Sequence, residues 1–314
     1  MIVVFGILGF LTLAVLVTCY ICFRMAFYAP RKPESGEFTL PDGDIYEAYR
    51  EPMTAWANQV RKMPHEDMEI VSFDGLILRG KFYEYAPGAP IELMFHGYRG
   101  AAERDLCGGV QRCFKLGHSA LIVDQRCAGG SDGHTITFGI KEHKDALCWV
   151  DFMVRRFGPE VRIILCGLSM GASTVMMAAG KDLPEQVVGV LADCGYSSAK
   201  EIIGLAVRQM GIPVKPGYFF ARLGARIYGG FDPEETSPVE ALKQAKVPVI
   251  FFHGEADDFV PCYMSKACFD ACASRKRLVT VPGAGHGLSY PTDPQGYIRA
   301  VREFFGPELC PEKK

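Results

Sequence analysis

The clearest chemical signal in this chain is a serine placed between two glycines. Residues 167–171 read Gly-Leu-Ser-Met-Gly, directly after the apolar run 161–166 and before the helix-forming run 172–179. A sharp turn from a strand into a helix exposes a serine hydroxyl, and the glycines leave room where a Cβ would collide. Unpaired N–H groups at a helix start favour developing negative charge. We therefore predict that Ser169 is a nucleophile.

A serine hydroxyl becomes a useful nucleophile when a base takes its proton. Of the seven histidines, His96, His253 and His286 follow apolar runs that predict strands. His286 lies in Gly-Ala-Gly-His-Gly after the last of these runs, where glycines permit a close-approaching loop. His96 and His253 each precede a glycine and are interpreted as structural or oxyanion-loop residues. The predicted base is therefore His286.

The base needs an acid to orient it, and three aspartates compete for this role. Asp257 lies in the loop after the penultimate predicted strand and is the preferred candidate. Its neighbour Asp258 is the nearest alternative, although it also fits a solvated loop carboxylate. Asp193, after an earlier strand, is a more distant alternative because the acid of such triads can occur there.

A tetrahedral oxyanion needs two backbone donors. The N–H of Met170 follows the nucleophile and supplies one. The N–H of Tyr98, in the sequence His-Gly-Tyr-Arg-Gly that ends an earlier strand, is the best second candidate, although the loop also fits a plain glycine-rich turn. No His/Cys/Asp cluster has the spacing of metal ligands, so we expect neither a metal nor a cofactor.

The elements that must position these residues alternate along the chain. Short apolar runs without alternation predict strands covered by helices on both faces, and residues 69–83 predict an antiparallel pair around an Asp-Gly turn. Helical stretches at 103–115, 141–157 and 173–181 separate the runs. The pattern predicts a doubly wound, mostly parallel, eight-stranded α/β sheet, whose strand ends carry the site. The runs are 90–95, 119–123, 161–166, 187–192, 248–252 and 278–281.

The N-terminus is apolar over a length that fits a bilayer. Residues 2–23 contain no charged side chain, and only Thr12, Thr18 and Tyr20 are plainly polar. As a helix they would reach roughly 33 Å, against about 30 Å for a hydrocarbon core. A cleaved signal peptide fits less well because no Lys or Arg precedes this long run, and a core helix is rarely apolar on every face. We predict a single-pass anchor at 1–23.

Charge and cysteine content predict the location of the remaining chain. Arg24, Arg31 and Lys32 follow the anchor and only the α-amino group precedes it, which favours a cytoplasmic C-terminal domain. Ten of the 12 cysteines lie beyond the anchor without disulfide-like spacing, in agreement with a reducing compartment. Cys19 and Cys22 form Cys-x-x-Cys inside the apolar run, where no zinc or redox site is expected. A net charge of −2 argues against nucleic acid as a partner.

The predicted organisation is an anchor (1–23), a linker with a juxtamembrane helix (24–65), a catalytic domain (66–306) and a tail (307–314). Residues 29–44 fit a linker, and residues 45–61 predict an apolar-striped helix that kinks or starts near Pro52 and packs on the main domain. We expect none of residues 1–28 to contribute to the sheet or the site, so their removal should leave a soluble, active domain.

The chain resembles the α/β-hydrolase superfamily, and within it membrane-anchored serine hydrolases grouped with the serine aminopeptidase-like hydrolases. The matching motifs follow the family order over about residues 66–305, and the order Ser169, Asp257, His286 is that of the superfamily. One motif departs: many relatives have Arg-Gly-His-Gly-x-Ser where residues 126–131 read Arg-Cys-Ala-Gly-Gly-Ser, a change expected at the pocket rim. The motifs lie at 73–80, 95–98, 124–126, 129–131, 167–171, 192–197, 253–261 and 281–286.

The resemblance implies that the long segment 197–240 is a cap over the nucleophile. Its apolar residues either line a pocket for acyl or aromatic groups or fill the core of the cap itself. The expected reaction is cleavage of an acyl ester, of a small-molecule or lipid-like substrate, through an acyl-serine intermediate. A serine peptidase or aminopeptidase is the alternative. A non-catalytic scaffold is disfavoured because every triad position is filled.

Overall fold

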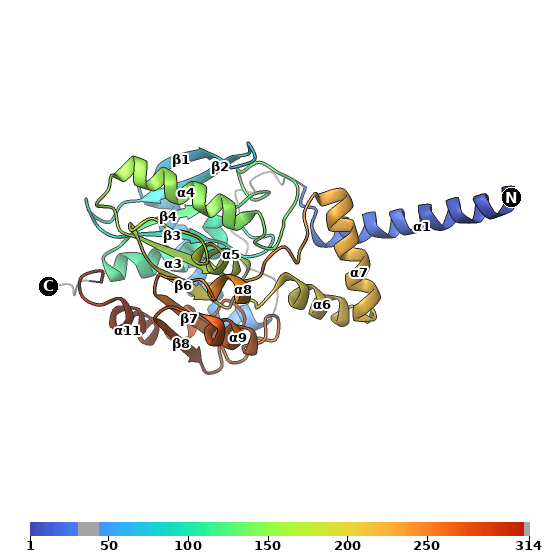
Figure 1. The fold of residues 1–314 in the computed structure, drawn as a ribbon. Coiled ribbons are helices and arrows are strands. Elements are labelled where there is room, and N and C mark those ends of the chain that lie inside the picture. Colours follow the sequence, from blue (N-terminus) through green and yellow to red (C-terminus); the bar gives the residue numbers. More distant parts are fainter. Residues whose placement is uncertain (31–43, 311–314) are drawn as a thin grey trace.

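The computed structural model describes residues 1–30 and 44–310, and its centre is one twisted sheet (Figure 1). Within these residues the sheet has eight strands in the order β1-β2-β4-β3-β5-β6-β7-β8. The first two pairings, β1 with β2 and β2 with β4, are antiparallel, and the others are parallel. This confirms the predicted fold. The strands are β1 (Glu66–Val71), β2 (Ile77–Tyr83), β3 (Ile91–Phe95), β4 (Ser119–Val123), β5 (Ile163–Leu168), β6 (Val187–Asp193), β7 (Val249–Gly254) and β8 (Lys276–Val281).

Helices cover both faces of the sheet, which explains why its central strands are apolar without alternation. Every residue of β3, β4 and β7 is buried. One face packs against α4 (Glu142–Phe157), α5 (Met170–Ala179) and α9 (Tyr263–Ala271). The other packs against α2 (Arg50–Lys62), α3 (Ala102–Leu116) and α11 (Pro294–Phe305). The short α10 (Ser289–Thr292) precedes α11.

The predicted helix at 45–61 is divided into two elements. A 3₁₀ segment, η1 (Asp44–Tyr49), leads into α2, whose first turn contains Pro52. Proline is tolerated there because the first N–H groups of a helix have no intrahelical acceptor. The apolar side of α2 faces the domain: Val60 is fully buried and the Trp56 ring lies 5.5 Å from that of Tyr290.

The segment between β6 and β7 forms a helical cap. It consists of α6 (Ala199–Gln209), α7 (Val214–Gly224), the π-helical turn η2 (Ala225–Gly229) and α8 (Pro238–Leu242). Serine side chains begin two of these helices: Ser198 accepts from the N–H of Glu201, and Ser237 from that of Glu240. In Figure 1 the cap helices α6 and α7 lie at the end of the domain from which the N-terminal helix projects.

The N-terminal helix α1 (Ile2–Ala26) is, in the described part of the chain, the one helix long and apolar enough to cross a membrane. It continues past the predicted boundary at residue 23, and its last part is not free. Cys19, Phe23 and Phe27 are buried against the domain, and the Ile136 N–H donates to the Phe27 carbonyl at 2.8 Å. The predicted linker therefore begins with residues that pack against the domain. Residues 31–43 of the linker, which include the charged Arg31 and Lys32, lie outside the described residues.

Candidate active site

The turn between β5 and α5 holds Ser169 in a backbone conformation that few L-residues adopt. Its φ is +55° and its ψ is −115°. The two flanking glycines make this turn possible. A Cβ on Gly167 would lie 2.1 Å from the carbonyl oxygen of Gly171, and one on Gly171 would lie 2.0 Å from that of Phe95. The strand-turn-helix context inferred for Ser169 is therefore present.

The structure brings Ser169, His286 and Asp257 into one hydrogen-bonded chain. The Ser169 hydroxyl oxygen lies 2.9 Å from His286 Nε2, and His286 Nδ1 lies 2.7 Å from Asp257 Oδ2. Ser169, Asp257 and His286 lie in the turns after β5, β7 and β8, respectively. The carboxyl ends of parallel strands meet at one edge of a sheet, and this brings the three turns together. The arrangement can move a proton from the serine to an imidazole whose other nitrogen faces a carboxylate.

Asp257 is held as an ionised acceptor. Burial by itself would raise its pKa, but hydrogen bonds from His253 and His286 outweigh burial and hold the pKa at about 2. The N–H groups of Val260 and Phe259 donate to Oδ1 at 2.8 and 3.0 Å. An ionised Asp257 accepts from His286 Nδ1–H, which leaves Nε2 free to accept from Ser169.

The contact between His253 and Asp257 was missed by the sequence reasoning. His253 Nε2 lies 3.3 Å from Asp257 Oδ2 and 2.7 Å from the Val260 carbonyl oxygen, and Nδ1 lies 2.6 Å from Ser265 Oγ. The buried ring therefore braces the Asp257 loop. The sequence signal for this contact was the spacing of four residues between His253, at the end of a predicted strand, and Asp257.

The two alternative acids lie elsewhere. Asp258 is exposed beside the site. Asp193 is buried, and its two carboxylate oxygens accept hydrogen bonds from Ser289 (2.8 Å) and Tyr297 (3.1 Å). Burial raises the pKa of Asp193, although these hydrogen bonds oppose the shift. Neither carboxylate takes the place that Asp257 occupies beside His286.

The two predicted oxyanion donors flank Ser169. Met170 is the first residue of α5, so its N–H has no intrahelical acceptor. The loop with Tyr98 passes close by, since a Cβ on Gly97 would lie 3.6 Å from the Cβ of Ser169. Within residues 1–30 and 44–310, neither N–H makes a hydrogen bond.

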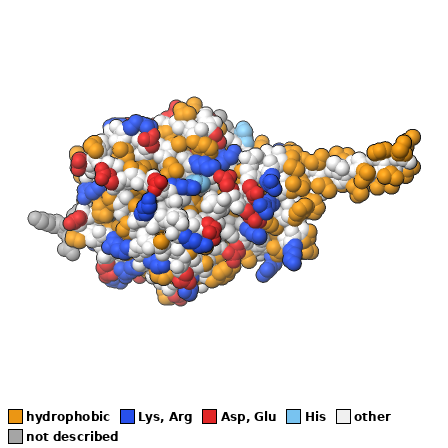
Figure 2. All heavy atoms as spheres, in the orientation of Figure 1, with side chains coloured by type: hydrophobic (Ala, Val, Ile, Leu, Met, Phe, Trp, Pro, Cys, Tyr) orange, Lys and Arg blue, Asp and Glu red, His pale blue; other side chains and the backbone are white. Residues whose placement is uncertain are grey.

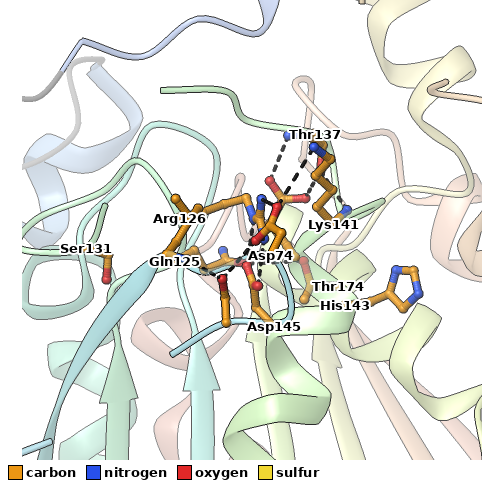
Figure 3. A network of polar contacts seen from close by, with 12 residues as sticks. Asp74, Gln125, Arg126, Ser131, Thr137, Lys141, His143, Asp145 and Thr174 are labelled. Atoms are coloured by element: carbon orange, nitrogen blue, oxygen red, sulfur yellow. Dashed lines mark hydrogen bonds and ion pairs between the residues drawn. The ribbon is translucent and has the colours of Figure 1, made fainter. Parts of the chain in front are cut away.

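A polar network fixes the loop that carries Tyr98. His96 Nε2 accepts from the Gln125 N–H at 3.0 Å, and the Gln125 side chain donates to the His96 carbonyl at 2.6 Å. Figure 3 shows the adjoining contacts: Arg126 binds Asp145 through two hydrogen bonds of 2.7 Å, and Arg126 also binds Asp74. The loop after β4 is thus tied to the β1–β2 turn and to α4.

Three side chains in the site carry atoms that could bind a metal: Cys194, Asp257 and His286, whose candidate atoms lie within 4.8 Å of one another. Two of them already bind each other. Burial raises the pKa of the Cys194 thiol well above its usual range, which disfavours the thiolate that metals prefer. The cluster fits a catalytic site better than a metal site.

Ser169 faces an apolar cavity of about 230 Å³ under the cap. The cavity continues between α6 and α7 and reaches α1, where Cys22, Met25 and Ala26 form part of its wall. The expectation that residues 1–28 contribute nothing to the site is therefore wrong. No sequence signal pointed to this wall, because α1 is apolar on all its faces. Cys127, in the motif that departs from the family pattern, is not among the residues that line the cavity.

Comparisons with known proteins agree with this architecture. The uncharacterized protein YqkD of Bacillus subtilis (strain 168) is 27% identical over 190 residues, which cover 60% of this chain and 62% of that protein. The alpha/beta hydrolase domain-containing protein WAV2 of Arabidopsis thaliana is 24% identical over 259 residues, covering 80% and 81% of the two chains. The structure of the Pyrococcus furiosus esterase Pf2001 matches with a TM-score of 0.66 and 18% identity, over 89% of this chain and 97% of that one. A profile of the alpha/beta hydrolase family matches residues 93–300. The chain belongs to the alpha/beta hydrolase family.

Proposed function

We propose that this protein is a serine hydrolase that cleaves acyl esters through an acyl-serine intermediate. The observation that carries the proposal is the continuous hydrogen-bonded chain from Ser169 through His286 to Asp257. Such a chain supplies a nucleophile, a base and a group that orients the base.

The reaction proceeds in two halves. The Ser169 oxygen attacks the carbonyl carbon of the ester while His286 Nε2 takes the hydroxyl proton. The tetrahedral intermediate collapses, the C–O bond to the alcohol breaks, and His286 returns the proton to the departing alkoxide. Water then attacks the acyl-serine with His286 again as base, which releases the carboxylic acid and restores Ser169.

The backbone N–H groups of Tyr98 and Met170 are proposed to stabilise the oxyanion formed in both halves. A preorganised donor of this kind typically contributes a factor of about 10²–10³ in kcat. The imidazolium that forms on His286 is stabilised by the ionised Asp257.

The composition of the cavity favours esters over peptides. Within the described chain, no residue that lines the cavity carries a charged side chain. An aminopeptidase must bind a charged substrate terminus, whereas an acyl chain needs only apolar walls. The reaction requires no metal or cofactor.

We also propose that α1 anchors the enzyme in a membrane. The helix has 25 residues and only Arg24, near its end, is charged. Positive charge at Arg24, Arg31 and Lys32 on the C-terminal side favours a cytoplasmic catalytic domain.

The decisive experiment is covalent labelling of the full chain by a fluorophosphonate, followed by mapping of the labelled peptide. We expect the label on Ser169, and Ser169→Ala should abolish it and lower kcat by roughly 10⁴-fold or more. Ser173→Ala is the matched control, since Ser173 Oγ bonds the Tyr196 carbonyl and not His286. Labelling that persists in Ser169→Ala would refute the proposal.

A further inference from the structure

The cap and α1 are packed together as one unit. Gly224 of α7 allows their backbones to touch, because a Cβ there would lie 2.3 Å from the Cys19 carbonyl oxygen. Further along α1, the Tyr228 hydroxyl donates to the Leu16 carbonyl at 3.1 Å, and its ring lies 5.3 Å from that of Tyr20. The cap therefore follows α1 as far as Leu16.

This contact determines how deep the cap must lie if α1 spans a bilayer. A hydrocarbon core about 30 Å thick takes up about 20 helical residues. Counted from Ile2, where α1 begins, 20 residues end at Ile21. Leu16 lies five residues before this point, or about 8 Å along the helix axis. The part of the cap that touches Leu16 would therefore lie below the hydrocarbon boundary, at the depth of about 5–10 Å that interfacial apolar helix faces reach.

The outer surface of the cap suits that position. Met210, Ile212, Phe219 and Ile227 are 53%, 43%, 58% and 47% exposed. Between residues 202 and 231 the chain has four basic side chains and no acidic one. Arg222 and Arg226 pair with the nearby Asp232, whereas Arg208 and Lys215 are exposed and in a position to meet lipid headgroups. Apolar groups that insert and basic groups that meet anionic headgroups are the features of a membrane-facing surface.

The figures agree with this orientation. In Figure 1, α7 lies crosswise at the base of α1, so a bilayer perpendicular to α1 would run along the cap. Figure 2 shows no charged side chain along the projecting length of α1, whereas hydrophobic, basic and acidic side chains all occur around its base.

The cavity that contains Ser169 opens on the same surface. Met210 and Ile212, at the turn between α6 and α7, both line the cavity and are exposed. Met25, on the α1 side, has the same two properties. Phe259, whose ring lies 5.0 Å from that of His286, also lines the cavity and is 46% exposed, whereas Ser169 itself is only 6% exposed. Met25, Met210 and Ile212 therefore form the apolar part of the opening that belongs to α1 and the cap.

We propose that the cap is embedded in the membrane interface and that Ser169 acts on long-chain acyl esters of membrane lipids. The acyl chain enters from the bilayer through the mouth formed by Met25, Met210 and Ile212. This inference rests on the proposed serine hydrolase activity and on the proposed anchor, and it names their substrate class and its route.

The depth of the cap can be measured without any assay of activity. Full-length Phe219→Trp is reconstituted into phosphatidylcholine vesicles that contain phosphatidylserine, with and without lipids brominated on their acyl chains. Bromine quenches tryptophan only on contact, so the added fluorescence should be quenched several-fold more than that of Val71→Trp. Val71 is the matched control because it is 67% exposed on β1, away from the cap. Equal quenching of the two variants would overturn the embedded cap.

The route is tested with two substrates: a long-chain monoacylglycerol in the same vesicles and a water-soluble butyrate ester. Met210→Glu with Ile212→Glu puts two charges where the acyl chain passes, so the ratio of long-chain to short-chain turnover should fall about tenfold or more. Val71→Glu should leave this ratio unchanged. An unchanged ratio in the mouth variant would overturn the route.

Failure of the underlying activity gives a different result. A wild-type protein that hydrolyses neither ester and takes no fluorophosphonate label on Ser169 would refute the serine hydrolase itself. A labelled Ser169 with turnover of the soluble ester only would refute the lipid substrate and leave the hydrolase in place.

Discussion

The phenol of Tyr98 donates a hydrogen bond of 2.8 Å to the carbonyl oxygen of Ala26. The neighbouring Arg99 donates to the Met25 carbonyl, also at 2.8 Å. The last carbonyls of a helix have no intrahelical donor, and a guanidinium there also complements the helix dipole. The loop whose backbone is proposed to bind the oxyanion therefore also holds the end of α1, so the two positions depend on each other.

The first prediction follows from this dependence. Deletion of residues 1–28 should lower the free energy of unfolding by about 3–6 kcal/mol, because Phe23 and Phe27 each bury an aromatic side chain. It should also reduce turnover of a soluble ester, because the deletion removes one wall of the cavity. Deletion of residues 1–15 is the control, since it keeps the buried part of α1. The prediction is checked by measuring thermal unfolding in detergent and ester turnover for both truncated proteins. Equal melting temperatures and equal turnover of the two proteins would contradict it.

The second prediction separates the three carboxylates. Asp257→Asn should lower kcat by about 10⁴-fold, because an amide favours the wrong histidine tautomer. Asp258→Asn should have little effect, since this side chain is exposed. Asp193→Asn should reduce stability more than kcat, because one of the two carboxylate oxygens that accept from Ser289 and Tyr297 becomes an amide nitrogen. Steady-state kinetics and thermal unfolding of the three proteins decide, and a large kcat loss in Asp258→Asn alone would move the acid.

The third prediction concerns the contact between α1 and α7. Gly224→Val should separate the two helices, because even a Cβ would lie 2.3 Å from the Cys19 carbonyl oxygen. We expect a lower melting temperature and faster proteolysis between α1 and the domain. Gly6→Val, on the same α1 with nothing within 4 Å of its Cβ position, is the control. A Gly224 variant as stable as the Gly6 variant would show that the contact is not tight.

The fourth prediction concerns pH. Since the Asp257 pKa is lowered from 3.8 to about 2, its carboxylate contribution to stability is complete above pH 3.8 and is lost only as the pH falls through about 2. Above pH 4 Asp257 therefore adds no ionisation of its own to the pH dependence of the proposed mechanism. A plot of log kcat/KM against pH should therefore have an acid limb with a slope of one. A slope of two would require a second ionisation in the site.

The meeting of Ser169, Asp257 and His286 could be predicted because each follows a short apolar run. Parallel strands place their carboxyl ends together, so strand order along the chain is enough to bring such residues to one edge. The sequence alone offered less basis for choosing between Asp257 and Asp258 as the acid. It depends on a turn in which the N–H groups of Phe259 and Val260 bind Asp257, and adjacent aspartates give no sign of which one the turn selects.

The role of α1 in the site could not be predicted from its sequence. Cys19, Phe23 and Phe27 lie on one side of the helix and are buried, but the residues on the other sides are equally apolar. Amphipathic periodicity reveals a buried face only when the opposite face is polar. A helix that contacts lipid on one side and protein on the other has no such contrast.

The packing of α1 also means that, if α1 is the membrane anchor we propose, another anchor cannot replace it in this protein. An α-helix turns by about 100° per residue. One residue inserted between Cys19 and Phe23 would therefore rotate these two side chains out of register. One residue inserted between the N-terminus and Cys19 would leave the cavity wall intact. A foreign transmembrane segment fused at Phe27 would tether the enzyme equally well, yet it would present unrelated side chains to Gly224 and to the cavity. In a chimera, membrane attachment and an intact cavity become separable properties.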